Sequence, residues 1–282
     1  MKKVYLVLIG LFLFSCSENK VYEVKLKGSE SMNEVFAALK KDFEEMQDSV
    51  KVSLEGGGSK TGLLAIANSE TDIGLSSFGF DLDSVLGAGH GVEEQVVAFD
   101  GIVLINNEQN KIRQLTNEQI NGIYSGKIAD WSQLGEAEGP ILPIVRDQNS
   151  GTQKLFTEYF GITHLATKAV IAKENVEIVS KVIENKNAIG FIGFAYFSIG
   201  VNDILIPSQS ESDSTVNYVL PSSATITNNI YPLKRPLRIY FRNNENPGQS
   251  AFLEYLNSGR GKNVIASFDL LTNVNQQFMA EK

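Results

Sequence analysis

The chemistry that this sequence suggests most directly is anion binding, and it is concentrated in the loop Arg146-Asp147-Gln148-Asn149-Ser150-Gly151-Thr152. Arg146 offers a permanent positive charge and a planar set of donors that suits phosphate or carboxylate. Ser150 and Thr152 add hydroxyl groups, and Gly151 lets the backbone approach a ligand closely. Side-chain and backbone donors together therefore predict an oxyanion site in residues 146–152.

The flanking residues predict where this loop lies in the fold. Residues 141–145 form an apolar strand, and residues 155–160 carry apolar side chains at the spacings of a buried helical stripe. The loop would therefore begin a helix, whose first N–H groups lack intrahelical partners and carry the positive end of the helix dipole. The alternative is that Asn149 or Ser150 only caps this helix, because both residue types are common N-caps.

Two earlier loops repeat the strand–loop–helix design. Gly28-Ser29-Glu30-Ser31 follows an alternating strand, residues 22–26, although Ser31 would serve equally well as an N-cap. The helix after it is expected to bury a face made by Met32, Val35, Phe36, Leu39, Phe43 and Met46. The Gly-rich residues 56–62 follow a strand at residues 50–54 and lead into an apolar helix. They do not match a nucleotide-binding P-loop, because Ser59 precedes Lys60 where that motif has Gly.

Composition and charge place the chain among globular binding proteins or enzymes. It has 282 residues, of which 43% are hydrophobic and 21% charged, and its formal net charge is −8. This acidic balance argues against nucleic acid as a partner. With only two histidines, His90 and His164, a zinc site is not expected, and no metal or other cofactor is predicted.

The first residues predict an export signal. Lys2 and Lys3 precede an apolar run, residues 4–14, which has the length of a signal-peptide core and is too short to span a bilayer. Residues 13–16 resemble a bacterial lipobox, and Cys16, the only cysteine, stands where lipid is attached, although Phe14 is bulkier than usual. We expect a signal peptide at residues 1–15 and a tether at 16–20. The alternative is an ordinary signal peptide with an incidental cysteine.

The rest of the chain alternates between strands and helices, which predicts an α/β fold. Residues 78–92 have no period and are expected to be a loop. Two long strands, residues 95–107 and 231–241, are expected to cross between lobes, with Pro232 and Pro236 setting the edges of the second. The other expected elements are a helix that starts in a Thr116–Gln119 capping box and stops at Gly126, a helix at 176–183, a strand at 187–194 and a last helix at 248–257.

Ligands in α/β folds lie beyond the carboxyl ends of the strands, so the three loops are expected to converge. Eight segments then share their order with a known family: 28–31 (GSES), 57–62 (GGSKTG), 71–77 (TDIGLSS), 97–102 (VAFDGI), 115–120 (LTNEQI), 126–131 (GKIADW), 146–152 (RDQNSGT) and 188–191 (AIGF). Over nearly the whole mature chain, the sequence resembles the phosphate-binding proteins of phosphate ABC transporters.

This resemblance implies a two-lobed periplasmic-binding-protein fold of type II, with the ligand cleft between the lobes. It implies lobe one at residues 21–99 and 233–282, lobe two at 100–232, and hinges near Asp100-Gly101 and residues 231–237. The phosphate-binding residues that it implies are Ser29, Glu30 through its backbone N–H, Ser31, Ser59, Ser77, Arg146, Ser150, Gly151 and Thr152. The implied partners are inorganic phosphate and an ABC permease, for a monomer at the periplasmic or cell surface whose lipid is its only contact with the membrane.

The sequence leaves the choice of anion open. Some family members have Asp at the position of Ser77, where it accepts the proton of hydrogen phosphate, and others have Ser followed by Arg. Here Phe78 follows, so sulfate or another oxyanion is an alternative ligand. Asp147 is expected either to orient Arg146 or to accept that proton.

Two further functions compete with uptake of phosphate. The chain would act as a sensor or scavenger if no permease accompanied it. A serine hydrolase is the remote enzyme alternative, since Lys60-Thr61-Gly62 and the Ser17–Lys20 spacing match motifs of penicillin-recognising enzymes. The chain has no Gly-x-Ser-x-Gly elbow at Ser59, and neither histidine lies in a recognisable motif, so no enzyme activity is predicted.

Overall fold

The computed structural model describes residues 20–135, 138–197, 199–209, 217–243 and 246–272. The predicted signal peptide, Cys16 and most of the predicted tether lie outside these ranges. Among the residues described, no helix combines the length and the hydropathy that crossing a membrane requires.

The fold is mixed α/β, as predicted, and nine of its strands form one sheet with the order β2-β1-β3-β11-β4-β7-β5-β6, with β8 beside β4. The strands are β1 (Tyr22–Gly28), β2 (Val50–Glu55), β3 (Ile73–Ser76), β4 (Glu93–Asn107), β5 (Leu142–Arg146), β6 (Val170–Ala172), β7 (Ala188–Gly193), β8 (Val201–Ile204), β9 (Ile206–Pro207), β10 (Tyr218–Val219) and β11 (Lys234–Phe241). Strands β9 and β10 form a separate antiparallel pair.

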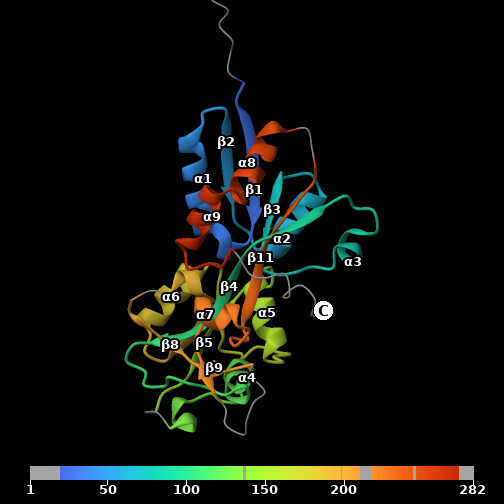
Figure 1. The fold of residues 1–282 in the computed structure, drawn as a ribbon. Helices are drawn as coiled ribbons and strands as arrows, with labels where there is room; N and C mark the ends of the chain where they lie inside the picture. The colour runs from blue at the N-terminus through green and yellow to red at the C-terminus, as the bar shows by residue number, and fades with distance from the viewer. Residues whose placement is uncertain (1–19, 136–137, 198, 210–216, 244–245, 273–282) are drawn as a thin grey trace, which may run out of the picture.

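Helices surround the sheet at both ends of the molecule (Figure 1). The α-helices are α1 (Asn33–Met46), α2 (Ser59–Ala67), α3 (Leu82–Leu86), α4 (Asn117–Ser125), α5 (Gly151–Tyr159), α6 (Asn175–Glu184), α7 (Ser223–Thr227), α8 (Pro247–Asn257) and α9 (Gly259–Ala266). Short 3-10 helices are η1 (Glu30–Met32), η2 (Trp131–Leu134) and η3 (Phe194–Tyr196). The capping box of Thr116 and Gln119 opens α4, and Gly126 ends it in the left-handed conformation, as predicted.

Strands β4 and β11 connect the two ends of the molecule (Figure 1). The first part of β4, residues 93–101, pairs with β11, and its second part, residues 102–107, pairs with β7 and β8. The strand continues through Asp100-Gly101 without a break. The long strand predicted at residues 95–107 is therefore confirmed, whereas the second predicted strand begins at Lys234 and pairs with β3 and the first part of β4.

The hydrophobic core divides into clusters on either side of this crossing. One large cluster joins β1, β2 and β3 to α1, α8 and α9. Two others join the second part of β4 to α4, α5 and α6. This distribution is consistent with lobes at residues 21–99 with 233–282 and at 100–232, and those boundaries stay a prediction.

Four local predictions were wrong. Met46, expected on the buried face of α1, is 51% exposed, because the helix ends there. Residues 78–92 contain the short helix α3, which Asp81 caps. The chain after Ser258 forms a further helix, α9. Pro236 lies inside β11 and opposite Phe99; the strand tolerates it because β3 joins the other side of β11 only from Arg238 onward.

Gly62 fixes the position of α2, the helix that begins with Ser59. A Cβ atom at Gly62 would lie 2.7 Å from the carbonyl oxygens of Leu75 and Lys27, which belong to the neighbouring strands. We expect Gly62→Ala to lower the free energy of unfolding by about 1–3 kcal/mol, because backbone atoms must move to make room. Thermal and denaturant unfolding measure the change.

Gly259→Ala is the matched control, because a Cβ atom there meets no atom within 4 Å. It is expected to leave the unfolding midpoint unchanged or to raise it slightly. If the two variants unfolded at the same midpoint, the space between Gly62 and the sheet would accommodate a methyl group, contrary to this prediction.

Candidate functional site

Serine hydroxyls from three strand ends meet at one buried point. Ser29 follows β1, Ser59 begins α2 and Ser77 follows β3, and each is at most 2% exposed. Ser29 Oγ donates to Ser77 Oγ at 2.9 Å, and Ser77 Oγ lies 3.3 Å from Ser59 Oγ. The strands β1 and β3 are parallel neighbours, so their carboxyl ends place these loops together.

The loop of residues 28–31 is held by its own backbone and by Glu30. Ser29 N donates to Leu75 O at 2.9 Å. The half-buried carboxylate of Glu30 accepts from Gly57 N at 2.5 Å and so joins this loop to the Gly-rich loop. The backbone at Gly28 (φ 144°) lies close to β3, and only glycine fits there, because a Cβ atom would lie 2.2 Å from Leu75 O.

The loop of residues 146–152 closes over these serines from the other lobe. Ser31 Oγ and Thr152 Oγ1 are 2.9 Å apart. Gly151 lies so close that a Cβ atom would be 2.5 Å from Ser59 Oγ and 2.8 Å from Ser77 Oγ. Lys60 N also donates to Asn149 O at 3.4 Å. The predicted convergence of the three loops is confirmed, and the cleft between them is closed.

Arg146 brings a buried positive charge to the end of β5, and its side chain is 2% exposed. Nη2 donates to Lys173 O at 2.6 Å. Within the described part of the chain, however, Nε and Nη1 are buried without any hydrogen-bond partner. Burial lowers the pKa of Arg146, the carboxylates of Asp147 and Glu30 raise it, and Arg235 lowers it. The guanidinium stays protonated regardless, so two charged donors await an acceptor.

A second buried arginine, which sequence reasoning missed, lies beside Thr152. Arg235 Nη1 donates to Thr152 Oγ1 at 2.6 Å, and Nη2 forms an ion pair with Asp100 Oδ2 at 2.8 Å. Burial raises the pKa of Asp100, and Arg235 opposes that effect by favouring the carboxylate. Arg235 and Asp100 face each other on the two crossing strands. Sequence analysis identified Asp100 only as a hinge residue.

Asn175 and Tyr196 also contribute contacts that the sequence did not reveal. Asn175, 1% exposed, accepts from Gly193 N at 3.3 Å, which leaves its Nδ2 to donate to Ser31 Oγ at 3.5 Å. Tyr196 OH donates to Glu30 O at 2.8 Å across the closed cleft. Burial raises the pKa of Tyr196, so its hydroxyl remains a neutral donor.

The structure also shows local contacts of three residues whose roles the sequence left open. Ser150 is the N-cap of α5 and its Oγ accepts from Gln153 N at 3.3 Å, although its own proton remains available to another group. Ser31 caps no helix. Asp147 accepts from Asn149 N at 2.7 Å and so closes the loop, which neither of its predicted roles included.

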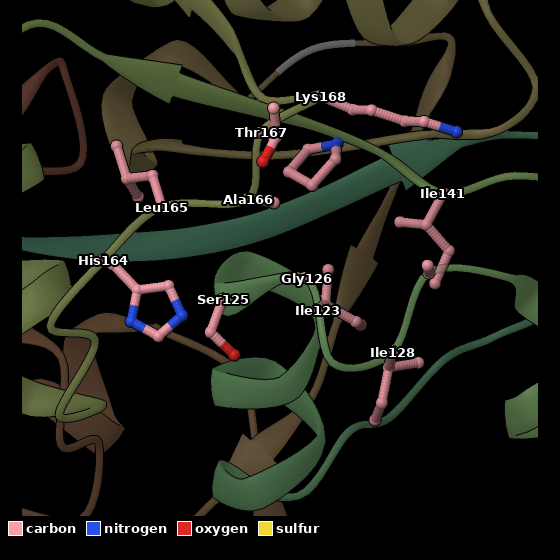
Figure 2. A pocket seen from close by; sticks show the side chains of 12 residues that line it. Ile123, Ser125, Gly126, Ile128, Ile141, His164, Leu165, Ala166, Thr167 and Lys168 are labelled. Atoms are coloured by element: carbon pink, nitrogen blue, oxygen red, sulfur yellow. The ribbon is translucent and has the colours of Figure 1, made fainter.

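A cavity of about 370 Å³ lies away from these loops, beside α4, between Ile128 and Ile141 on one side and the loop of residues 164–168 on the other (Figure 2). Its lining is largely apolar and its titratable side chains, His164 and Lys168, are exposed. Among the described residues, no group of three or more His, Cys, Asp or Glu side chains is placed to hold a metal ion.

Comparisons with known proteins agree with this fold. The family model for the PBP superfamily domain matches residues 16–260, so the chain belongs to the PBP superfamily. The phosphate-binding protein PstS of Borreliella burgdorferi is 25% identical over 278 residues, which cover 94% of this chain and 96% of that protein.

Two solved structures extend the likeness. A putative phosphate ABC transporter substrate-binding protein from Clostridium perfringens, with bound phosphate, is 27% identical with a TM-score of 0.78, covering 89% of this chain and 99% of that one. An ABC-type phosphate transport receptor from Vibrio cholerae is 25% identical with a TM-score of 0.70, covering 89% and 100%. The resemblance to phosphate transporter binding proteins that the sequence predicted is confirmed.

The two buried arginines allow a direct test of which one the fold needs. In anion-free buffer we expect Arg146→Met to keep the free energy of unfolding within about 1 kcal/mol of the wild type or to raise it, because two unpaired buried donors are removed. Arg235→Met is the matched control. This variant leaves the buried carboxylate of Asp100 without its ion-pair partner. We expect it to lower the free energy of unfolding by about 3–5 kcal/mol. Denaturant unfolding measures the free energy of unfolding of both variants. A similar decrease in the two would contradict the conclusion that the fold depends on Arg235 and not on Arg146.

Proposed function

We propose that this chain binds inorganic phosphate in the closed cleft and delivers it to an ABC permease for uptake. The observation that carries the proposal is the buried guanidinium of Arg146, whose Nε and Nη1 lack partners among the described residues. An oxyanion held by Arg146 and the surrounding hydroxyls would supply the missing acceptors. The relatives named above, one of them with bound phosphate, support phosphate as that oxyanion.

The proposed ligand contacts are those predicted from the resemblance. They are Ser29, Glu30 through its backbone N–H, Ser31, Ser59, Ser77, Arg146, Ser150, Gly151 and Thr152. In the closed cleft, the hydroxyls of Ser29, Ser31, Ser59, Ser77 and Thr152 bond to one another. Each can exchange that contact for a bond to an anion, so the site is assembled from groups that already lie together.

The site must also distinguish hydrogen phosphate from sulfate, which has a similar shape. The side chains that meet between the loops are mainly hydroxyls, and the carboxylate of Glu30 beside them already accepts from Gly57 N and Asn33 Nδ2. Hydrogen phosphate must place its proton on an acceptor, whereas sulfate needs donors alone. A serine oxygen can accept that proton, and Ser77 is the central candidate because it bonds to both Ser29 and Ser59. Sulfate therefore remains the alternative ligand.

Release of the ligand requires the cleft to open. We propose lobes at residues 21–99 with 233–282 and at 100–232, which rotate about β4 near Asp100-Gly101 and about residues 231–237. The permease would recognise the closed form. A role as a phosphate sensor uses the same closure, and finding a permease gene beside the gene for this chain would favour transport over sensing. We propose no catalytic activity for the chain.

Calorimetric titration of the purified protein, stripped of bound anion, tests the ligand. We expect phosphate to bind with heat that saturates at one equivalent, and sulfate to bind more weakly or not at all. Ser77→Asp should raise the ratio of phosphate to sulfate affinity by at least about tenfold, because a carboxylate accepts the phosphate proton and repels sulfate. Ser77→Asn is the control of similar size without charge. Tight sulfate binding by the wild type would reassign the ligand.

We further propose that the chain is held at the periplasmic or cell surface by lipid on Cys16, with residues 1–15 removed and 16–20 as the tether. Cys16→Ser is expected to move the protein from the membrane fraction to the soluble fraction, because the lipid is the only lasting membrane attachment in the proposal and docking on the permease is transient. Fractionation after a salt wash measures this. A Cys16→Ser protein that stayed with the membranes would refute the lipid anchor.

A further inference from the structure

Arg235 connects the crossing strands to the proposed anion site. Its guanidinium lies on β11, is 2% exposed, and has two kinds of buried partner. Nε and Nη2 donate to Asp100 Oδ2 at 3.2 and 2.8 Å, and Nη1 donates to Thr152 Oγ1 at 2.6 Å. One side chain therefore joins β11 and β4 to the first turn of α5.

The surrounding structure fixes the orientation of this pair. Asp100 Oδ1 accepts from Phe194 N at 3.2 Å, so both carboxylate oxygens are bonded. Gly193 leaves room for the pair, because a Cβ atom there would lie 2.8 Å from Asp100 Oδ2 and 3.0 Å from Arg235 Nη2. With two of its nitrogens bound to Asp100, the guanidinium can turn little, and Nη1 stays directed at Thr152.

The direction of the bond matters for the hydroxyl of Thr152. A guanidinium only donates, so Thr152 Oγ1 must accept from Arg235. The positive charge polarises the O–H bond of Thr152 and makes it a stronger donor. In the closed cleft, Ser31 Oγ lies 2.9 Å from Thr152 Oγ1 and can accept that proton. An anion that entered between the lobes would receive it instead.

We propose that Arg235, oriented by Asp100, is a positioning residue of the anion site that acts through Thr152. The proposal rests on the proposed function, because the anion is the group that receives the Thr152 proton. It also gives Asp100 and Arg235 a task beyond joining the crossing strands. They couple the hinge region to one ligand donor, so that Thr152 is directed correctly when the lobes are closed.

The experiment is a double-mutant cycle read by phosphate titration of the stripped protein. One arm replaces the whole ion pair with apolar side chains, Asp100→Leu with Arg235→Met, which avoids leaving a buried charge unpaired. The other arm is Thr152→Val, which keeps the shape of the side chain and removes the hydroxyl. The wild type, both arms and the triple variant are compared, and thermal unfolding of each establishes that it is folded.

We expect the pair replacement to raise the Kd for phosphate by about 10- to 100-fold, as loss of one charge-assisted hydrogen bond does. Thr152→Val should raise Kd by a similar or larger factor. The triple variant should be no weaker than Thr152→Val alone, because the pair acts through that hydroxyl. The proposal would be overturned if the increases in Kd caused by the two arms multiplied in the triple variant. It would also be overturned if the pair replacement bound phosphate with the Kd of the wild type.

Arg235→Lys provides a second test if the pair replacement does not fold. Lysine keeps the positive charge beside Asp100, but its single nitrogen cannot reach Asp100 and Thr152 in the geometry of the guanidinium. We expect a folded protein whose Kd for phosphate is raised several-fold. A lysine variant that bound like the wild type would refute positioning. Absence of phosphate binding by the wild type would instead refute the proposed function itself.

Discussion

The rest of this structure depends on one constraint, which is that the buried charge of Arg146 needs acceptors that the described residues do not supply. One of its nitrogens bonds to Lys173 O, and two have no partner within the described residues. Leaving charged donors unsatisfied in a closed interior is costly, and folded proteins rarely do so without a reason. An anion between the lobes is the simplest way to remove this cost, and it would hold the lobes together in doing so.

The two buried arginines show how the fold separates stability from binding. Arg235 is paired with Asp100 and belongs to the crossing strands, whereas no carboxylate in the described ranges is bonded to Arg146. A carboxylate paired to Arg146 would compete with the ligand. Around them, hydroxyl groups serve as donors that carry no net charge, which suits an acidic protein that must hold an anion through local contacts.

Local sequence patterns were enough to predict the loops and the elements that carry them. The strand before Arg146, the helix after Ser150 and the three Gly- and Ser-rich loops lie where periodicity and capping rules placed them. Arg235 escaped prediction because it lies far along the chain, in a strand whose pairing places it opposite Asp100, and only tertiary packing brings its side chain to Thr152. Asn175 in α6 and Tyr196 in η3 likewise reach the site through tertiary contacts between distant segments. Helix α9 follows α8 after a single residue, Ser258, whose hydroxyl caps α9, so the signal that ends one helix also begins the next.

A crystal structure of the protein grown with phosphate tests the central claim most directly. We expect the phosphate oxygens to lie within hydrogen-bond distance, about 2.7–3.0 Å, of Arg146 Nε and Nη1. The hydroxyls of Ser31 and Thr152 should then turn from each other toward the anion. A structure in which phosphate lies elsewhere, with the Arg146 nitrogens still unpartnered and the hydroxyls still bonded to one another, would contradict this account.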